Sequence, residues 1–189
     1  MKKIAIILPY LKAGGTERQA YYIAKHLQSK VDVTVITFED TGSFKNMYKN
    51  IKIHCLNVVL CKKNTFEIML RLIKLLSREK FDLVISRAWR SNFLVAISSL
   101  ILKIPYVLFL SSATNQNMNK IKNKAQGYLI SKANLIFSVS QKAKTNCINT
   151  YGIDGDNIKV VQNGVDIDYI KKCRKKIIRL LLKLQRVSL

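Results

Sequence analysis

Apolar positions along this chain alternate between two periods. Short, continuously apolar and β-branched runs are separated by longer segments in which apolar residues recur every three or four positions. The first run, Lys3–Leu8 (KIAIIL), is typical of a strand that is buried on both faces. The next segment, Thr16–Gln28, places Ala20 and Ala24 on one face of a helix, with Thr16 as its expected N-cap.

The same alternation continues to residue 162. Strands are predicted at Lys3–Leu8, Val31–Thr37, Ile51–Cys55, Asp82–Ser86, Tyr106–Leu110, Leu135–Val139 and Ile158–Gln162. Helices are predicted at Thr16–Gln28, Phe66–Leu76, Trp89–Leu102, Gln116–Ser131 and Gln141–Tyr151. This order predicts an α/β fold: a doubly wound, mostly parallel Rossmann-like sheet with helices on both faces and ligands at the carboxyl ends of its strands.

Composition changes this picture in one respect, which is charge. The 189 residues include 33 Lys and Arg against 11 Asp and Glu, a formal net charge of +22. Residues 170–189 hold eight of the bases and no acid. Such a charge favours anionic partners such as a membrane surface, although a Lys-rich proteome would produce it as well. No nucleic-acid-binding motif is present, so no nucleic acid partner is expected.

Cysteines and histidines give no sign of a metal site. Four cysteines and two histidines show no ligand-like spacing, and no disulfide framework is indicated. We therefore expect reduced thiols, no metal and a cytoplasmic protein, since the apolar run after Met1 is too short for a signal peptide.

Candidate ligand-binding residues follow the predicted strands. Gly14, Gly15 and Thr16 precede the first helix, where glycines allow close approach and free amides favour an anion; a purely structural turn is the alternative. The segment 86–92 (SRAWRSN) offers Arg87 and Arg90 for a phosphate or sugar; the alternative is that Trp89 starts a packed helix and both arginines are solvated.

Two further loops lie at the same predicted edge. The segment 111–117 (SSATNQN) brings Ser111 and Asn115, whose hydroxyl and amide groups suit a sugar. Asn163-Gly164-Val165-Asp166 is either a tight turn or a ligand loop.

Three segments together resemble a known family. The GGTER stretch after the first strand, the FDLVISRAWRSN stretch at 81–92 and the KVVQNGVD stretch at 159–166 are similar to the N-terminal domain of family 4 glycosyltransferases of the GT-B fold. The resemblance covers residues 1–169. It implies a retaining transfer of a sugar from a nucleotide donor to a sugar or lipid-linked acceptor in cell-envelope polysaccharide synthesis.

The resemblance also implies roles for the candidate residues. The donor-phosphate-facing loop would be Gly14, Gly15 and Thr16; the acceptor site would be Glu17, Arg87, Arg90, Ser111 and Asn115; and the interdomain cleft would be lined by Asn163, Gly164 and Asp166. Many members carry a histidine after the fifth strand, where this sequence reads Leu110-Ser111-Ser112-Ala113, so the catalytic residues are unknown.

A second domain with an E-x7-E motif binds the nucleotide sugar in this family and is not recognised in the sequence. We therefore expect domain 1–169 to be inactive alone, with a nucleotide-sugar donor bound only in a two-domain form or with a separately encoded donor-binding half. The tail 170–189 is either a basic amphipathic helix on the inner face of the membrane, the product of a frameshift or truncation, or an ordinary terminal helix. The alternative function is a basic α/β binding module for anionic membrane or nucleic acid, without catalysis.

Overall fold

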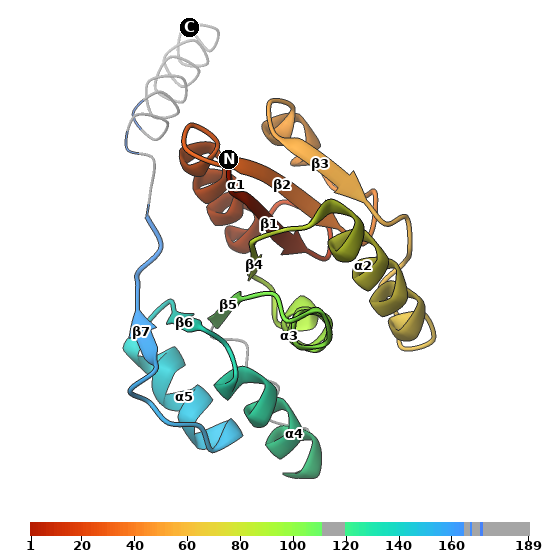
Figure 1. Cartoon of the computed structure of the whole chain (residues 1–189). Coiled ribbons are helices and arrows are strands. Elements are labelled where there is room, and N and C mark those ends of the chain that lie inside the picture. Colours follow the sequence, from red (N-terminus) through yellow and green to blue (C-terminus); the bar gives the residue numbers. More distant parts are fainter. Residues whose placement is uncertain (111–119, 165–166, 168–170, 172–189) are drawn as a thin grey trace, which may run out of the picture.

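The computed structural model describes residues 1–110, 120–164, 167 and 171, which form a seven-stranded sheet flanked by helices (Figure 1). The strands are β1 (Lys3–Leu8), β2 (Asp32–Thr37), β3 (Lys52–Cys55), β4 (Leu83–Ser86), β5 (Tyr106–Leu110), β6 (Leu135–Ser138) and β7 (Ile158–Val160). The helices are α1 (Gly15–Leu27), α2 (Thr65–Glu79), α3 (Trp89–Leu102), α4 (Lys120–Ser131) and α5 (Gln141–Tyr151), with a 3-10 helix, η1, at Lys45–Tyr48. The predicted strands and helices are therefore confirmed, with residues 116–119 of the predicted helix Gln116–Ser131 outside the described residues. The helix η1 was not predicted, because no apolar period indicates it.

The strand order is β3-β2-β1-β4-β5-β6-β7, and every paired neighbour is parallel. The chain winds outward from β1 to β3, returns to place β4 beside β1, and then winds outward in the other direction. This reversal makes the sheet doubly wound, as the alternation predicted. The loops that follow β1 and β4 leave the same sheet edge on opposite sides of the reversal.

The core lies in two layers, one on each face of the sheet. Along β1, Ile4, Ile6 and Leu8 belong to the cluster that includes residues of α1 and η1, while Ala5 and Ile7 belong to the cluster on the other face, to which α2, α3, α4 and α5 contribute. A strand covered on both faces needs no polar alternation, which explains the continuous apolar run.

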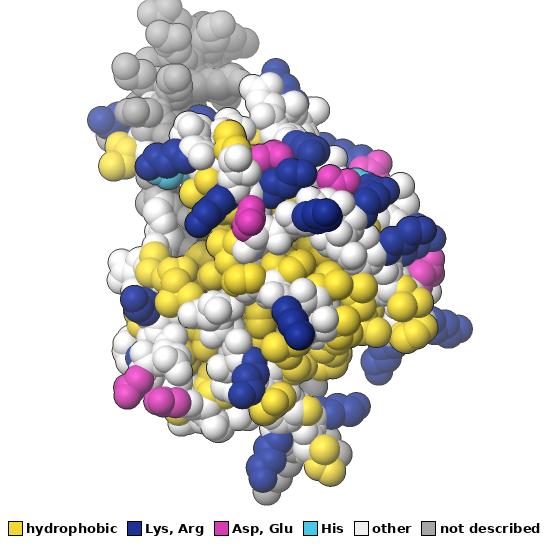
Figure 2. Space-filling view, viewed as in Figure 1, with side chains coloured by type: hydrophobic (Ala, Val, Ile, Leu, Met, Phe, Trp, Pro, Cys, Tyr) yellow, Lys and Arg dark blue, Asp and Glu magenta, His cyan; other side chains and the backbone are white. Residues whose placement is uncertain are grey.

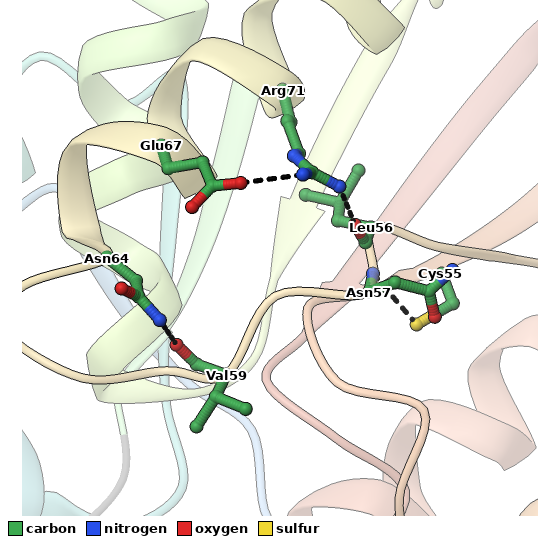
Figure 3. Close-up of polar contacts among 7 residues, drawn as sticks. All are labelled: Cys55, Leu56, Asn57, Val59, Asn64, Glu67 and Arg71. Carbon is green, nitrogen blue, oxygen red and sulfur yellow. Dashed lines mark hydrogen bonds and ion pairs between the residues drawn. The ribbon is translucent and has the colours of Figure 1, made fainter.

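Helix α2 begins after a connection that side chains hold in place (Figure 3). Arg71 Nη1 donates to the Leu56 carbonyl at 2.8 Å, and Arg71 Nη2 pairs with Glu67 Oε1 at 2.6 Å. Asn64 Nδ2 donates to the Val59 carbonyl at 3.0 Å. These bonds satisfy backbone carbonyls between β3 and α2 and tie the connection to the helix.

The loops after β1 and β2 are in direct contact. The Leu11 amide donates to the Thr41 carbonyl at 3.0 Å, and the Phe44 amide donates to the Leu11 carbonyl at 2.9 Å. Gly42 lies between these bonds with a φ of +131°, and a Cβ there would overlap the Leu11 carbonyl group. Only glycine meets both requirements, so Gly42 fixes the path of the loop that leads to α1.

Replacing Gly42 with Ala should therefore destabilise the fold by about 1–3 kcal/mol, because it adds a clash to a strained backbone conformation. Urea unfolding followed by circular dichroism measures this change. The matched control is Gly15→Ala, since nothing lies within 4 Å of a Cβ at Gly15. Equal unfolding midpoints for the two variants would contradict the role given to Gly42.

Candidate functional site

The candidate site lies at the carboxyl ends of β1 and β4, where the winding of the sheet reverses. Ile7 of β1 pairs with Ser86 of β4, and the Arg87 amide donates to the Ile7 carbonyl at 3.5 Å. The β1–α1 loop and the β4–α3 loop therefore start side by side. In open α/β sheets this crevice is where ligands bind.

Helix α1 begins at this edge on Gly14, not on Thr16. Gly14 is the N-cap, with extended backbone and no side-chain cap, and its carbonyl accepts the Arg18 amide at 3.1 Å. The prediction of Thr16 as N-cap is therefore wrong: the helix starts two residues earlier because Gly15 and Thr16 already have helical backbone. Gly15 is exposed and has open space around its Cα.

Glu17 turns back toward the start of α1 and does not extend into solvent. Its side chain is 7% exposed, and a Cβ on Gly14 would overlap its Oε2. Burial raises the pKa of Glu17, while a hydrogen bond from its own backbone amide opposes the shift. The carboxylate thus occupies the amide-rich helix start in the manner of a capping group, and its assignment to the acceptor site stays a prediction.

Tyr48 joins η1 to α1 beneath the site. Its ring is fully buried and packs edge-on against Tyr21 with centroids 5.4 Å apart. Its hydroxyl donates to the Glu17 backbone carbonyl. Burial raises the pKa of Tyr48, and the charge of Glu17 raises it further. Sequence patterns missed Tyr48 because η1 is a single turn without a helical apolar period.

Arg87 is the one predicted basic residue that the structure buries at this edge. Its side chain is 6% exposed, its guanidinium carbon lies 4.1 Å from the centroid of the Phe109 ring, and its Nη2 donates to Asn163 Oδ1 at 3.3 Å. Burial lowers the pKa of Arg87 to about 10, a shift that the nearby Tyr48 opposes. Arg87 is therefore still a cation at neutral pH.

Arg90 and Trp89 are not brought to the same place. Arg90 is exposed in the first turn of α3 and makes no ion pair with the described residues. The Trp89 indole donates to the Tyr151 hydroxyl at 2.9 Å, which ties α3 to α5. The packed-helix interpretation is thus right for Trp89 and for the solvated Arg90, but it is wrong for Arg87, which is buried at this edge.

Asn163 and Gly164 follow β7 and lie against the other two loops. Asn163 accepts the bond from Arg87, and Gln19 of α1 donates through Nε2 to the Gly164 carbonyl at 2.5 Å. Three segments predicted separately, around residues 14–19, 87 and 163–164, therefore meet. Ser111, Asn115 and Asp166 lie outside the described residues.

Two kinds of feature are absent from the part of the chain that the structure describes. There, no group of three or more His, Cys, Asp or Glu is placed to hold a metal ion. Among the same residues, no helix is long and apolar enough to cross a bilayer.

The fold is that of one half of a GT-B protein. The structure of HepE from Anabaena in complex with UDP-glucose matches with a TM-score of 0.73 at 22% identity, over 94% of this chain and 50% of that chain. A glycosyltransferase from Rickettsia africae matches with 0.71 at 18% identity, over 93% and 49%. The lipopolysaccharide outer core galactosyltransferase WaaB matches with 0.63 at 19% identity, over 88% and 47%.

The chain thus spans about half the length of these solved structures. Residues 13–169 match the profile of Glycosyltransferase Family 4, so the chain belongs to that family. No curated relative matches the sequence significantly. The family resemblance read from the three motifs is confirmed.

Because Glu17 is buried, the free energy of unfolding should depend on pH in a way that can be tested. Because its pKa is raised in the folded state, folding stability declines as pH rises from the usual glutamate range through the raised pKa. Glu17→Gln removes the ionisable group, so the unfolding free energy of this variant should rise relative to that of the unsubstituted chain between about pH 4 and pH 7. Urea unfolding at both pH values measures the difference, with the exposed Glu67→Gln as control. A difference that is constant with pH, or that moves the other way, would contradict the burial of the carboxylate.

Proposed function

We propose that this chain supplies the acceptor side of a retaining glycosyltransferase that acts in cell-envelope polysaccharide synthesis. Its partners in the reaction are a nucleotide-sugar donor and a sugar or lipid-linked acceptor. The convergence of the Gly14-Gly15 loop, Arg87 and the Asn163-Gly164 loop at the β1/β4 reversal carries this proposal. Membership of glycosyltransferase family 4 and the likeness to HepE and WaaB support it.

Each part of the edge has a proposed role. Gly14, Gly15 and Thr16 face the donor phosphate, since open space at Gly15 lets a ligand approach the backbone. Arg87 contributes to the acceptor site, as do Glu17, Arg90, Ser111 and Asn115 in the full proposal. Asn163, Gly164 and Asp166 line the cleft toward the donor-binding half.

The nucleotide sugar would be bound by a donor-binding half outside these 189 residues, either in a longer form or as a separate partner. The half-length match to HepE supports this division. Residues 1–169 would form the acceptor domain, and 170–189 a basic tail. Apart from Lys171, that tail lies outside the described residues, and its three interpretations stay predictions.

Gly15→Val tests the reaction when the chain is combined with a donor-binding half. A branched side chain at this exposed position should obstruct the ligand and reduce sugar transfer by about a hundredfold, with an unchanged unfolding midpoint. Release of nucleoside diphosphate measures transfer, and Gly15→Ala, which adds only a methyl group, should lose much less. Unchanged turnover in Gly15→Val would contradict the assignment of this loop. Equal transfer by the 189 residues alone would contradict the need for a donor-binding half.

We also propose that the protein binds peripherally to an anionic membrane surface. Figure 2 shows hydrophobic side chains gathered in the middle of one face, around the place of α3 in Figure 1, with Lys and Arg spread about them. The exposed apolar residues at the end of α3 are Leu100 and Ile101, and the exposed Lys103 follows them. Apolar contact beside positive charge suits an interface with acidic headgroups.

Sedimentation with lipid vesicles tests this surface. The chain should bind vesicles that contain phosphatidylglycerol, release from them in high salt, and bind phosphatidylcholine vesicles weakly. Replacing Leu100 and Ile101 together with Ser should weaken binding several-fold, because the apolar contribution is lost. Val59→Ser, another exposed apolar position, is the control. Binding that ignores lipid charge, or that survives the double substitution, would contradict this proposal.

A further inference from the structure

Arg87 carries a buried charge that the described residues do not neutralise. The ion pairs of the described residues involve Lys45, Arg71 and Arg78, and none involves Arg87. Its Nε is buried and has no hydrogen-bond partner among the described residues. A buried cation without a counter-charge is costly to keep, which makes it a candidate for binding an anion supplied from outside.

The surroundings of Arg87 stabilise a cation only in part. The face of the Phe109 ring lies 4.1 Å away, and Asn163 supplies one amide oxygen at 3.3 Å. Besides the cation–π contact and one neutral hydrogen bond, most of the five guanidinium N–H groups have no partner among the described residues, since only Nη2 donates to one of them. The fork of donors matches a carboxylate or phosphate.

The position of Arg87 adds a second source of positive potential. Arg87 directly precedes Ala88, the N-cap of α3, and that N-terminus has no side-chain cap. The N-terminal end of α3, a helix of 14 residues, thus starts beside the guanidinium. At the neighbouring α1 start, by contrast, the Glu17 carboxylate already lies near the amides. The positive potential at Arg87 and the start of α3 is therefore not balanced by a nearby carboxylate among the described residues, whereas that at the start of α1 is. An anion should bind preferentially at the start of α3.

From this geometry we propose that Arg87 and the start of α3 bind an oxyanion of the substrate, a phosphate or carboxylate, at the β1/β4 reversal. The proposal rests on the proposed function in placing a substrate at this edge. It deepens that function by making the group that Arg87 recognises an anion and not a neutral sugar hydroxyl. The oxyanion belongs either to the acceptor or to the nucleotide donor, and the two sources share this chemistry.

Inorganic phosphate is the probe, titrated into the full 189-residue chain by calorimetry at neutral pH and constant ionic strength in chloride. Arg87→Met should weaken phosphate binding by about tenfold or more, because a charge-assisted pair is lost. Arg78→Met is the matched control: it removes the same charge from an exposed side chain near the end of α2, which has no proposed binding role, and it should leave binding within about twofold. Equal binding in both variants, equal losses in both, or no binding by the unsubstituted chain would overturn the proposal.

Stability separates a binding role from a structural one. Because the charge of Arg87 is buried without an ion pair, Arg87→Met should keep the thermal midpoint of the unsubstituted chain or raise it. A large loss of stability would make Arg87 a structural residue. If Arg87→Met fails to fold, Arg87→Lys decides: it keeps the charge without the fork, and should fold but bind phosphate several-fold more weakly. Wild-type affinity in Arg87→Lys would overturn recognition by the guanidinium fork.

Competition then identifies the source of the oxyanion. If UDP displaces phosphate and glucose 1-phosphate does not, the oxyanion belongs to the donor. If glucose 1-phosphate displaces phosphate and UDP does not, the oxyanion belongs to the acceptor. In either case the displacement requires Arg87. If neither displaces phosphate, the proposal is wrong. Since these experiments read binding by the chain alone, they succeed or fail independently of sugar transfer in Gly15→Val.

Discussion

The reversal of winding between β1 and β4 is the constraint on which the rest of this structure depends. Right-handed crossovers carry the chain from β1 to β2 on one face of the sheet and from β4 onward on the other face. The loops after β1 and β4 therefore separate at the carboxyl edge instead of covering it. That separation positions the Gly14-Gly15 loop and Arg87, and Asn163 and Gly164 contact them from the end of β7.

Charge is distributed unevenly around the edge. On the α1 side, the Glu17 carboxylate lies over Gly14, and Tyr48 supports the Glu17 carbonyl from below. On the α3 side, Arg87 is buried against Phe109 without an acidic partner among the described residues. On the α1 side the carboxylate thus lies near the amides of the helix start, while on the α3 side Arg87 retains hydrogen-bond donors without a partner among the described residues. A buried cation without a counter-charge lowers the folding stability of the free protein, and a bound anion would supply the missing partner.

Most of the fold could be predicted from the sequence, because the apolar runs of β1, β2 and β5 and the helical period of α2 are unambiguous signals. Even the bounds of α3 and α5 agree with those predicted. The start of α1 was misplaced because Thr is a common N-cap, whereas here the extended backbone of Gly14 takes that position. The single turn of η1 leaves no period to detect.

The candidate site was predicted in outline but not in its contacts. Glycines, Arg87 and Asn163-Gly164 could be placed at one edge, because parallel strands end together. Sequence alone could not tell Arg87 from Arg90, since burial depends on which of the two meets Phe109 and Asn163. It also could not reveal that Glu17 faces inward, because a charged residue in a first helical turn is usually solvated.

Nuclear magnetic resonance of the full chain, with inorganic pyrophosphate added stepwise, tests the central claim most directly. The account predicts that the Arg87 Nε–H signal and the amide signals of Gly15, Asn163 and Gly164 shift together, with one saturation curve. Shifts confined to exposed lysines, or an Arg87 signal that does not move, would contradict a ligand site at the β1/β4 reversal.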